Sequence, residues 1–305
     1  MDTSTAQAIA AITEDSLSGA VEIAARSAAV LQQVALTDSS DHLDTLRARL
    51  LEVGWILISA HPTMAPLVNL VNAVLWSLDD RGELVQARQV VAEVVIEFTR
   101  RLHVHEAAIA ETTLRLIPDE GTILTAGRST TVGAALRYAH RAGRRFRVLC
   151  AEGRPGLEGR SLATELATSS IPVTLMVDAL AIASVAEAQL ILVGADHLSG
   201  IGLVNKVGTY GIALAAQVAR VPVYALCGSE KFLPPGYLPP AQTEWPAEQV
   251  WPEAPLGVTV ANLYFDRTPL ATLAGIVTEQ GIQPTAGIEA WLAATRLHPA
   301  LLAGP

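Results

Sequence analysis

Five short apolar runs in the second part of the chain constrain its fold more than any other feature. Each has the length of a strand and is almost continuously apolar, as expected for parallel strands buried on both faces. The runs are "TILTA", "RFRVLCA", "IPVTLMV", "QLILVGA" and "VPVYALC", and the helical stretches between them are "STTVGAALRYAHRAG", "GRSLATELATSS" and "KVGTYGIALAAQVAR". This alternation predicts an α/β fold with a Rossmann-like, doubly wound parallel sheet.

The chain before these runs has a different pattern. From about Thr5 to Leu116, apolar residues recur at spacings of three and four, which predicts four or five helices and no strand. The segment "IPDEG" separates the two patterns. We therefore predict a helical domain over residues 1–117 and a Rossmann-like domain over residues 118–305. The proline-rich stretch from Leu233 to Pro255 predicts a loop within the second domain.

Composition narrows the class of protein. A chain of 305 residues that is 50% apolar can bury a full core in one large or two modest domains. The formal charge of -9 argues against wholesale nucleic-acid binding. Two cysteines are too few for a disulfide framework, and the N-terminus lacks the pattern of an export signal. We expect a cytoplasmic protein without a membrane-spanning segment, because charges or prolines interrupt every long apolar stretch.

Polar residues follow the predicted strands at the edge of the sheet where ligands bind in such folds. The functional crevice of an open parallel sheet lies beyond the carboxyl ends of its strands. Several cations fall there although the protein is acidic. The residues at these positions are Gly127, Arg128, Ser129, Glu152, Arg154, Asp196, Asn205, Lys206 and Lys231.

This set of residues suits a phosphate group. Ser129 or Thr130 can cap the helix that follows, and the free amides of a helix N-terminus favour an anion. Arg128 and Arg154 can make charge-assisted contacts, with Lys206 or Lys231 as point charges. The alternative is that these are solvated charges at the rim and that Ser129 is only a cap. Convergence from four loops favours a phosphorylated metabolite, a sugar phosphate or a nucleotide, as the ligand.

Two further motifs do not support a cofactor. "HVHE", from His103 to Glu106, places its histidines two residues apart, and such residues face different sides of a helix. "GRPGLEG", from Gly153 to Gly159, lacks the Lys-Ser/Thr ending of a phosphate-binding loop and the full dinucleotide fingerprint. We expect neither a bound metal nor a cofactor.

Several motifs together resemble one known family. "EGRPGLEGRSLATELATSSIPVTLMVD", "VGADHLSGIGLVNKVGTYGIALAA" and "CGSEKF" are similar to the initiation factor 2B alpha, beta and delta subunits, ribose-1,5-bisphosphate isomerases and methylthioribose-1-phosphate isomerases. The similar region extends upstream through "DSLSGAVEIAARSAAVL" and downstream through "NLYFDRTPLATLAGIVTEQGIQP". The resemblance implies helices before a Rossmann-like domain, a homodimer or larger homo-oligomer, and a sugar-phosphate crevice.

The resemblance also implies roles for individual residues. Asp196 in "GAD" matches the catalytic aspartate of the isomerases, which convert an aldose 1-phosphate to a ketose 1-phosphate, and it can protonate the ring oxygen. Its alternative role is a cap or an ion-pair partner. The substrate-binding candidates are Gly19, His61, Arg128, Ser129, Arg154, Asn205, Lys206 and Lys231.

The sequence departs from the isomerases at the position of their catalytic cysteine. Gly127 in "TAGRS" stands where the bisphosphate isomerases have the thiol in T-H-C-N-S. Ser18 and His61 stand where arginines are expected, and the loop after "GAD" is one residue shorter. Cys150 and Cys227 lie at predicted strand ends but are more typical of buried core residues.

Three functions remain open on the sequence alone. The first is a sugar-phosphate-binding protein that lacks the family's thiol. The second is a divergent isomerase that uses Asp196, and the third is a noncatalytic subunit of a translation initiation factor 2B-like exchange complex. Ligand binding is favoured in each of them by the retention of four residues: Asp196, Arg154, Lys206 and Lys231.

Overall fold

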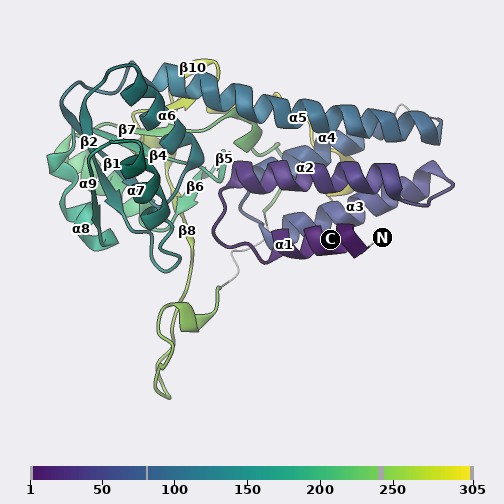
Figure 1. Ribbon diagram of the computed structural model, residues 1–305, viewed down its shortest axis with the longest axis horizontal. Helices are drawn as coiled ribbons and strands as arrows, with labels where there is room; N and C mark the ends of the chain where they lie inside the picture. Colours follow the sequence, from purple (N-terminus) through teal and green to yellow (C-terminus); the bar gives the residue numbers. More distant parts are fainter. Residues whose placement is uncertain (1–2, 80–81, 240–243, 303–305) are drawn as a thin grey trace. The chain divides into compact units, whose positions relative to one another are not determined.

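The computed structural model describes residues 3–79, 82–239 and 244–302. Its contacts define two compact units (Figure 1). The helical unit comprises Met1–Val104, Glu230–Pro240 and Glu289–Pro305. The sheet unit comprises His105–Ser229 and Ala241–Ile288. The chain therefore enters the helical unit three times.

The helical unit is built around one strongly apolar helix. Helix α4 buries residues on nearly all its sides and packs against both α2 and α3. Its sequence "APLVNLVNAVLWSLD" contains no charge before its last residue, which suits a central position. The helices are α1 (Thr3–Thr13), α2 (Ala20–Thr37), α3 (Leu43–Ala60), α4 (Ala65–Asp79) and α5 (Leu84–Thr113), which confirms the helical prediction.

Two later segments complete the helical unit. The Asn69 side chain donates to the carbonyl oxygens of Glu230 and Phe232, at 2.7 and 2.9 Å. The Asn72 amide donates to the Arg296 carbonyl at 3.1 Å and accepts from the His298 backbone N–H at 2.7 Å. Four residues of these segments join the core: Leu233, Tyr237, Leu297 and Leu301. The predicted division at 117/118 lies between α5 and β1, but it does not include this return of the chain.

Helix α5 is shared by the two units. Its residues up to Val104 count with the helical unit, and those from His105 count with the sheet unit. Ile109 and Ala110, in its last turns, are buried in the core of the sheet unit. Among the described residues, no helix is both long enough and apolar enough to cross a membrane.

The sheet unit contains the predicted parallel sheet. Within the described residues it has seven strands in the order β10-β9-β7-β4-β1-β2-β3, and only β10 is antiparallel to its neighbour. The strands are β1 (Gly121–Ala126), β2 (Phe146–Ala151), β3 (Val173–Met176), β4 (Leu190–Val193), β7 (Val223–Leu226), β9 (Gly275–Thr278) and β10 (Gly281–Gln283). The chain proceeds from β1 to β2 on one side and returns as β4 on the other. The topological switch point therefore lies between β1 and β4.

The five predicted strands are all present, and helices separate most of them. The helices are α6 (Thr130–Arg141), α7 (Gly159–Thr168), α8 (Asp178–Ala183) and α9 (Thr209–Ala219). One detail of the prediction is wrong. Thr174 and Leu175 of β3 are exposed, because β3 is an edge strand and is not covered on both faces. Helix α10 (Ile288–Leu292) and short 3-10 helices at Val185–Glu187, Ser229–Lys231, Ala247–Gln249, Leu270–Thr272 and Pro299–Leu301 complete the secondary structure.

A small antiparallel sheet was not predicted from the sequence. It pairs β5 (His197–Ser199) with β6 (Gly202–Lys206) and β6 with β8 (Phe265–Thr268). Strand β6 therefore carries both Asn205 and Lys206. Of the predicted proline-rich loop, residues 240–243 lie outside the described residues. After these residues, the Trp245 backbone N–H donates to the Asn262 carbonyl oxygen at 2.9 Å. The Trp245 ring stacks on Tyr264 with the ring centroids 4.4 Å apart.

Candidate functional site

Two candidate side chains meet at the switch point between β1 and β4. Ser129 caps α6, and its hydroxyl accepts from the Val132 N–H at 3.3 Å. A Cβ at Gly194, directly after β4, would lie 2.7 Å from the Ser129 Oγ and 3.4 Å from the Asn205 Oδ1. The absence of a side chain at Gly194 therefore allows Ser129 and Asn205 to approach each other.

Asn205 and Lys206 are fixed at the end of β6. The Asn205 amide donates to the Thr209 hydroxyl at 3.0 Å, and that hydroxyl donates to the Lys206 carbonyl at 2.6 Å. The side chains of Asn205 and Lys206 are both buried. These bonds hold the turn between β6 and α9 and orient both side chains.

The Lys206 ammonium lies in a confined polar environment. Its Nζ is 2.8 Å from Glu158 Oε1 and 4.3 Å from the centroid of the Tyr264 ring. The exposed fractions of the Lys206 and Glu158 side chains are only 7% and 15%. Among the described residues, Glu158 is the only ion-pair partner of Nζ, and further donors of the ammonium have no protein acceptor. A buried ammonium has three donors, and a group of this kind is normally satisfied by protein, water or a ligand.

Burial raises the pKa of Glu158, and the neighbouring Lys206 charge partly opposes this rise. The same desolvation, assisted by the Glu158 charge, raises the pKa of the Tyr264 phenol. A carboxyl group with a raised pKa can exchange a proton nearer to neutral pH than an exposed one. The pair of Glu158 and Lys206 is therefore chemically different from a surface ion pair.

The two candidate arginines contact other groups. The Arg128 Nε donates to Glu165 Oε1 at 2.9 Å, and the other Glu165 oxygen accepts from Arg137 at 3.2 Å. Arg154 is exposed, and its Nη2 donates to the Val250 carbonyl at 3.3 Å. The Arg154 backbone N–H donates to Asp178 at 2.8 Å, which fixes this loop at the start of α8.

Asp196 lies three residues after the end of β4 and directly before β5, and it is partly exposed. Its backbone N–H donates to the Val204 carbonyl at 2.9 Å, so its position is tied to β6. Both cysteines are buried. Burial raises the pKa of Cys150 to about 12, which leaves almost no thiolate at neutral pH. Cys150 is therefore unsuited to replace the thiol that is missing at Gly127.

The remaining candidates belong to the helical unit. Gly19 is the N-cap of α2, and its N–H donates to Glu22 Oε2 at 3.0 Å. The His61 Nε2 lies 2.8 Å from the Ile12 carbonyl oxygen, and burial lowers the pKa of this imidazole. Lys231, in the segment Glu230–Pro240, has an exposed fraction of 3%.

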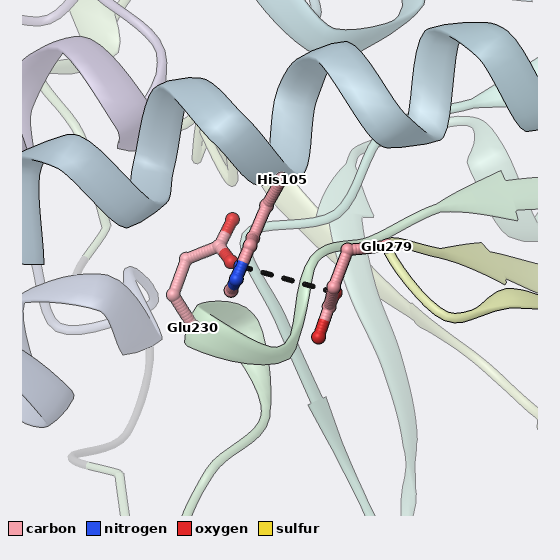
Figure 2. Close-up of side chains that lie close together, drawn as sticks. All are labelled: His105, Glu230 and Glu279. Atoms are coloured by element: carbon pink, nitrogen blue, oxygen red, sulfur yellow. Dashed lines mark ion pairs between the residues drawn. The ribbon is translucent and has the colours of Figure 1, made fainter.

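The "HVHE" motif lies on α5. His103 is exposed. The His105 Nδ1, in contrast, lies 3.9 Å from the Glu279 Oε2, and a dashed line joins these two side chains in Figure 2. Glu279 also accepts from the Ser229 backbone N–H at 3.1 Å. The two histidines thus differ in environment, as their spacing predicts.

Glu158 and Tyr264 are the site residues that the sequence did not identify. Glu158 is the N-cap of α7 within "GRPGLEG", and Tyr264 precedes β8. The only available signal was an acid within a glycine-rich turn at a strand end. Tyr264 offered no signal, because its approach to Lys206 depends on the unpredicted sheet.

The fold and the site define a class of protein: an α/β protein with helices before a parallel sheet and polar side chains, Lys206 among them, after its strands. The sequence model of the Initiation factor 2 subunit family matches residues 16–285. The chain belongs to this family, which confirms the resemblance that the motifs indicated.

Relatives in this family carry several names. The chain is 33% identical over 278 residues to ribose 1,5-bisphosphate isomerase of Methanocaldococcus jannaschii, covering 90% of this chain and 88% of that protein. It is 34% identical over 233 residues to methylthioribose-1-phosphate isomerase of Heliobacterium modesticaldum, covering 70% and 67%. The structure of Pyrococcus horikoshii translation initiation factor eIF-2B matches with a TM-score of 0.80 and 27% identity, covering 93% of this chain and 98% of that one.

Proposed function

We propose that this protein binds a sugar phosphate in the crevice at the carboxyl ends of β1 and β4. The observation that carries the proposal is the buried Lys206 ammonium, which retains hydrogen-bonding capacity beside a single carboxylate. Removing an ammonium from water costs roughly several kcal/mol of free energy. We therefore expect such a buried group where its charge has a use. Asn205 and Ser129 extend the same polar surface toward the switch point.

The N-terminus of α6 is the better place for the phosphate. At α9, the Asp266 carboxylate already accepts from the N–H groups of Gly208 and Tyr210, at 2.8 and 3.1 Å. A second anion would be repelled there. At α6 the cap is the neutral Ser129, and the first amides of a helix have no partners within it. These amides and the positive end of the helix dipole favour a phosphate at α6.

The names of the relatives support a phosphorylated sugar as the ligand. Two of them are isomerases of a ribose 1,5-bisphosphate and a methylthioribose 1-phosphate. In this proposal Asp196 lies beside the sugar ring and Arg154 contacts the ligand from the loop after β2. A homodimer or larger homo-oligomer in the cytoplasm completes the proposal, and sedimentation analysis tests the assembly.

A ligand screen tests this function. We expect ribose 1,5-bisphosphate, methylthioribose 1-phosphate, deoxyribose 1-phosphate or a nucleoside monophosphate to raise the unfolding temperature, because ligands stabilise the state that binds them. Lys206→Ala or Arg154→Ala should weaken binding measured by calorimetry by about 1.5–3 kcal/mol. Arg160→Ala is the control, since Arg160 is an exposed cation nearby that pairs with Glu152. Unchanged affinity in Lys206→Ala would refute the proposed site.

The runner-up function is a noncatalytic subunit of a translation initiation factor 2B-like exchange complex. The relatives that carry the name of this factor favour it. Absence of binding to every compound of the screen, together with capture of a GTPase by the purified protein, would replace the sugar-phosphate proposal with this one.

A further inference from the structure

The carboxyl group of Glu158 lies in a cradle of three glycines. A Cβ at Gly127 would be 3.2 Å from Glu158 Oε1, and one at Gly153 would be 3.1 Å from the same oxygen. A Cβ at Gly156 would be only 2.8 Å from Oε2. Gly127 and Gly153 also have positive φ angles, of 63° and 76°. Side chains at these three positions would crowd the carboxylate, so the glycines make room for it.

This cradle lies at the carboxyl end of β1, where the proposed ligand binds. Gly127 is the first residue after β1 and precedes the turn into α6 by two residues. The same Cβ position at Gly127 lies 3.2 Å from the Lys206 Cγ, so the carboxylate, the ammonium and the β1 turn converge. A helix N-cap normally accepts from its own helix through its side chain. Glu158 is the N-cap of α7 but makes no such bond, and its carboxylate lies against Lys206 instead.

We propose that Glu158 is a catalytic acid-base residue that moves a proton between two neighbouring carbons of a bound aldose 1-phosphate. This inference rests on the proposed function, because it requires the sugar phosphate to lie against Gly127 and Lys206. It assigns to a carboxylate the proton transfer for which the buried Cys150 is unsuited.

The proposed step is balanced in atoms and electrons. The Glu158 carboxylate removes the proton from C2, the C–H electron pair forms the C1–C2 double bond, and the bond from C1 to the ring oxygen breaks. The ring oxygen takes its proton from the Asp196 carboxyl. The resulting enol then loses its hydroxyl proton to Asp196, and C1 takes the proton from Glu158. The product is the ketose 1-phosphate, and both carboxyl groups return to their starting states.

The surroundings of Glu158 suit a group that must both accept and release a proton. Burial raises its pKa, with a smaller contribution in the same direction from the Asp178 charge, while Lys206 stabilises the ionised form. General acid-base groups work best when their pKa lies near the working pH. Lys206 also neutralises the carboxylate, so that a phosphorylated ligand can approach it.

Turnover and binding of ribose 1,5-bisphosphate, measured separately, test the inference. Conversion in D₂O is followed by phosphorus and proton NMR, and affinity by calorimetry. Glu158→Gln keeps the shape but cannot transfer the proton, so we expect kcat to fall at least ~100-fold, with deuterium uptake at C1 lost equally. Affinity should be unchanged or higher, because Lys206 loses its counterion.

Glu279→Gln is the matched control. Glu279 belongs to the same unit, its side chain has an exposed fraction of 11%, and its Oε2 lies 3.9 Å from the His105 Nδ1. We expect its kcat to change less than about threefold. If Glu158→Gln does not fold, Glu158→Asp provides the test: it retains the charge but withdraws it by one methylene, and kcat should fall roughly 10-fold with affinity unchanged.

The outcomes separate the two proposals. If the wild type binds and converts the compound and Glu158→Gln keeps its kcat, the role of Glu158 is overturned but the proposed function is not. Where only Glu158→Asp folds, an unchanged kcat in that variant has the same meaning. Binding without conversion by the wild type would also overturn the role of Glu158 and leave the proposed function intact. Absence of binding by the wild type would overturn both. Loss of conversion with binding retained in Glu158→Gln supports both.

Discussion

Two polar clusters, one in each unit, hold a partly buried carboxylate beside a cation. In the helical unit, Asp15 accepts from the N–H groups of Leu17 and Ser18, from the Ser18 hydroxyl and from Arg26. Burial opposes ionisation of Asp15, but these four bonds outweigh it and hold the pKa well below its usual range. In the sheet unit, Glu158 and Lys206 have mainly each other.

The difference between the clusters lies in how fully their charges are satisfied. Asp15 has several short bonds, and its cluster fixes the turn between α1 and α2. Lys206 is more deeply buried and has fewer partners, an arrangement that stability alone does not favour. A fully bonded polar cluster maintains structure, whereas a buried charge with remaining donors is available to a ligand. On this basis we distinguish the Asp15 cluster from the pair of Glu158 and Lys206.

The largest expected effect on stability comes from breaking the buried pair of Lys206 and Glu158 in the sheet unit. Lys206→Met leaves the Glu158 carboxylate without its counterion, and we expect the free energy of unfolding to fall by about 3 kcal/mol. Adding Glu158→Gln should recover part of that loss, because it removes the isolated charge. Urea unfolding of the two variants measures both effects.

Arg26→Met is the control in the helical unit. The Arg26 side chain is 40% exposed, so solvent already screens its pair with Asp15 and the loss should stay below about 1 kcal/mol. Equal losses for Lys206→Met and Arg26→Met would contradict the distinction drawn between the clusters.

A somewhat smaller effect is expected at Gly127. Its φ of 63° favours glycine, so Gly127→Ala should lower the free energy of unfolding by about 1–2 kcal/mol. The new methyl group would also press on Glu158 and Lys206, so ligand affinity should fall. Gly143→Ala is the control, because Gly143 has a positive φ but nothing lies within 4 Å of its Cβ position.

The family's thiol gives a second test at this position. Gly127→Cys alone should not raise isomerase turnover, because Ser18 and the shortened loop after Asp196 also differ from the isomerases. A large increase in turnover by this single variant, measured by phosphorus NMR, would show that the crevice needs nothing but the thiol.

The helical unit should show its own dependence on pH through His61. Burial lowers the pKa of His61, with Arg26 acting in the same direction and Asp15 and the Ile12 carbonyl opposing. The unfolded chain therefore takes up this proton first as the pH falls below about 6.5. The stability that neutral His61 provides above that pH should be lost as the pH falls toward the pKa of His61 in the folded protein. The loss in the free energy of unfolding is at most about 1.4 kcal/mol per pH unit.

Urea unfolding between about pH 7.5 and pH 5.5 measures this loss, since Asp residues titrate mainly below that range. His61→Gln keeps a donor toward Ile12 but cannot be protonated, so its curve should be flatter. An equal slope in this variant would assign the pH dependence to another group.

The sequence predicted the fold better than the site, for physical reasons. Strands such as Gly121–Ala126 are buried throughout and mostly apolar, and this pattern is local. Strand β6 pairs with β8, some sixty residues away, and both are short, so no local pattern revealed the sheet that carries Lys206. Glu158 was missed for a similar reason. Its importance comes from its approach to Lys206, which is visible only once the chain has folded.

The smallest expected effect concerns Arg128, which the sequence placed beside the ligand. The side chains of Arg128 and Glu165 are 17% and 36% exposed, and Glu165 keeps Arg137 at 3.2 Å if Arg128 is removed. Arg128→Gln should therefore lower the free energy of unfolding by less than about 1 kcal/mol. Sugar-phosphate affinity should change less than about threefold, against roughly tenfold or more for Lys206→Ala. A loss in Arg128→Gln as large as that in Lys206→Ala would mean that the guanidinium leaves Glu165 for the ligand. The anion would then be held by a cation from the turn before α6 as well as by the helix amides, and the contrast between the buried Lys206 and the ion-paired Arg128 would no longer hold.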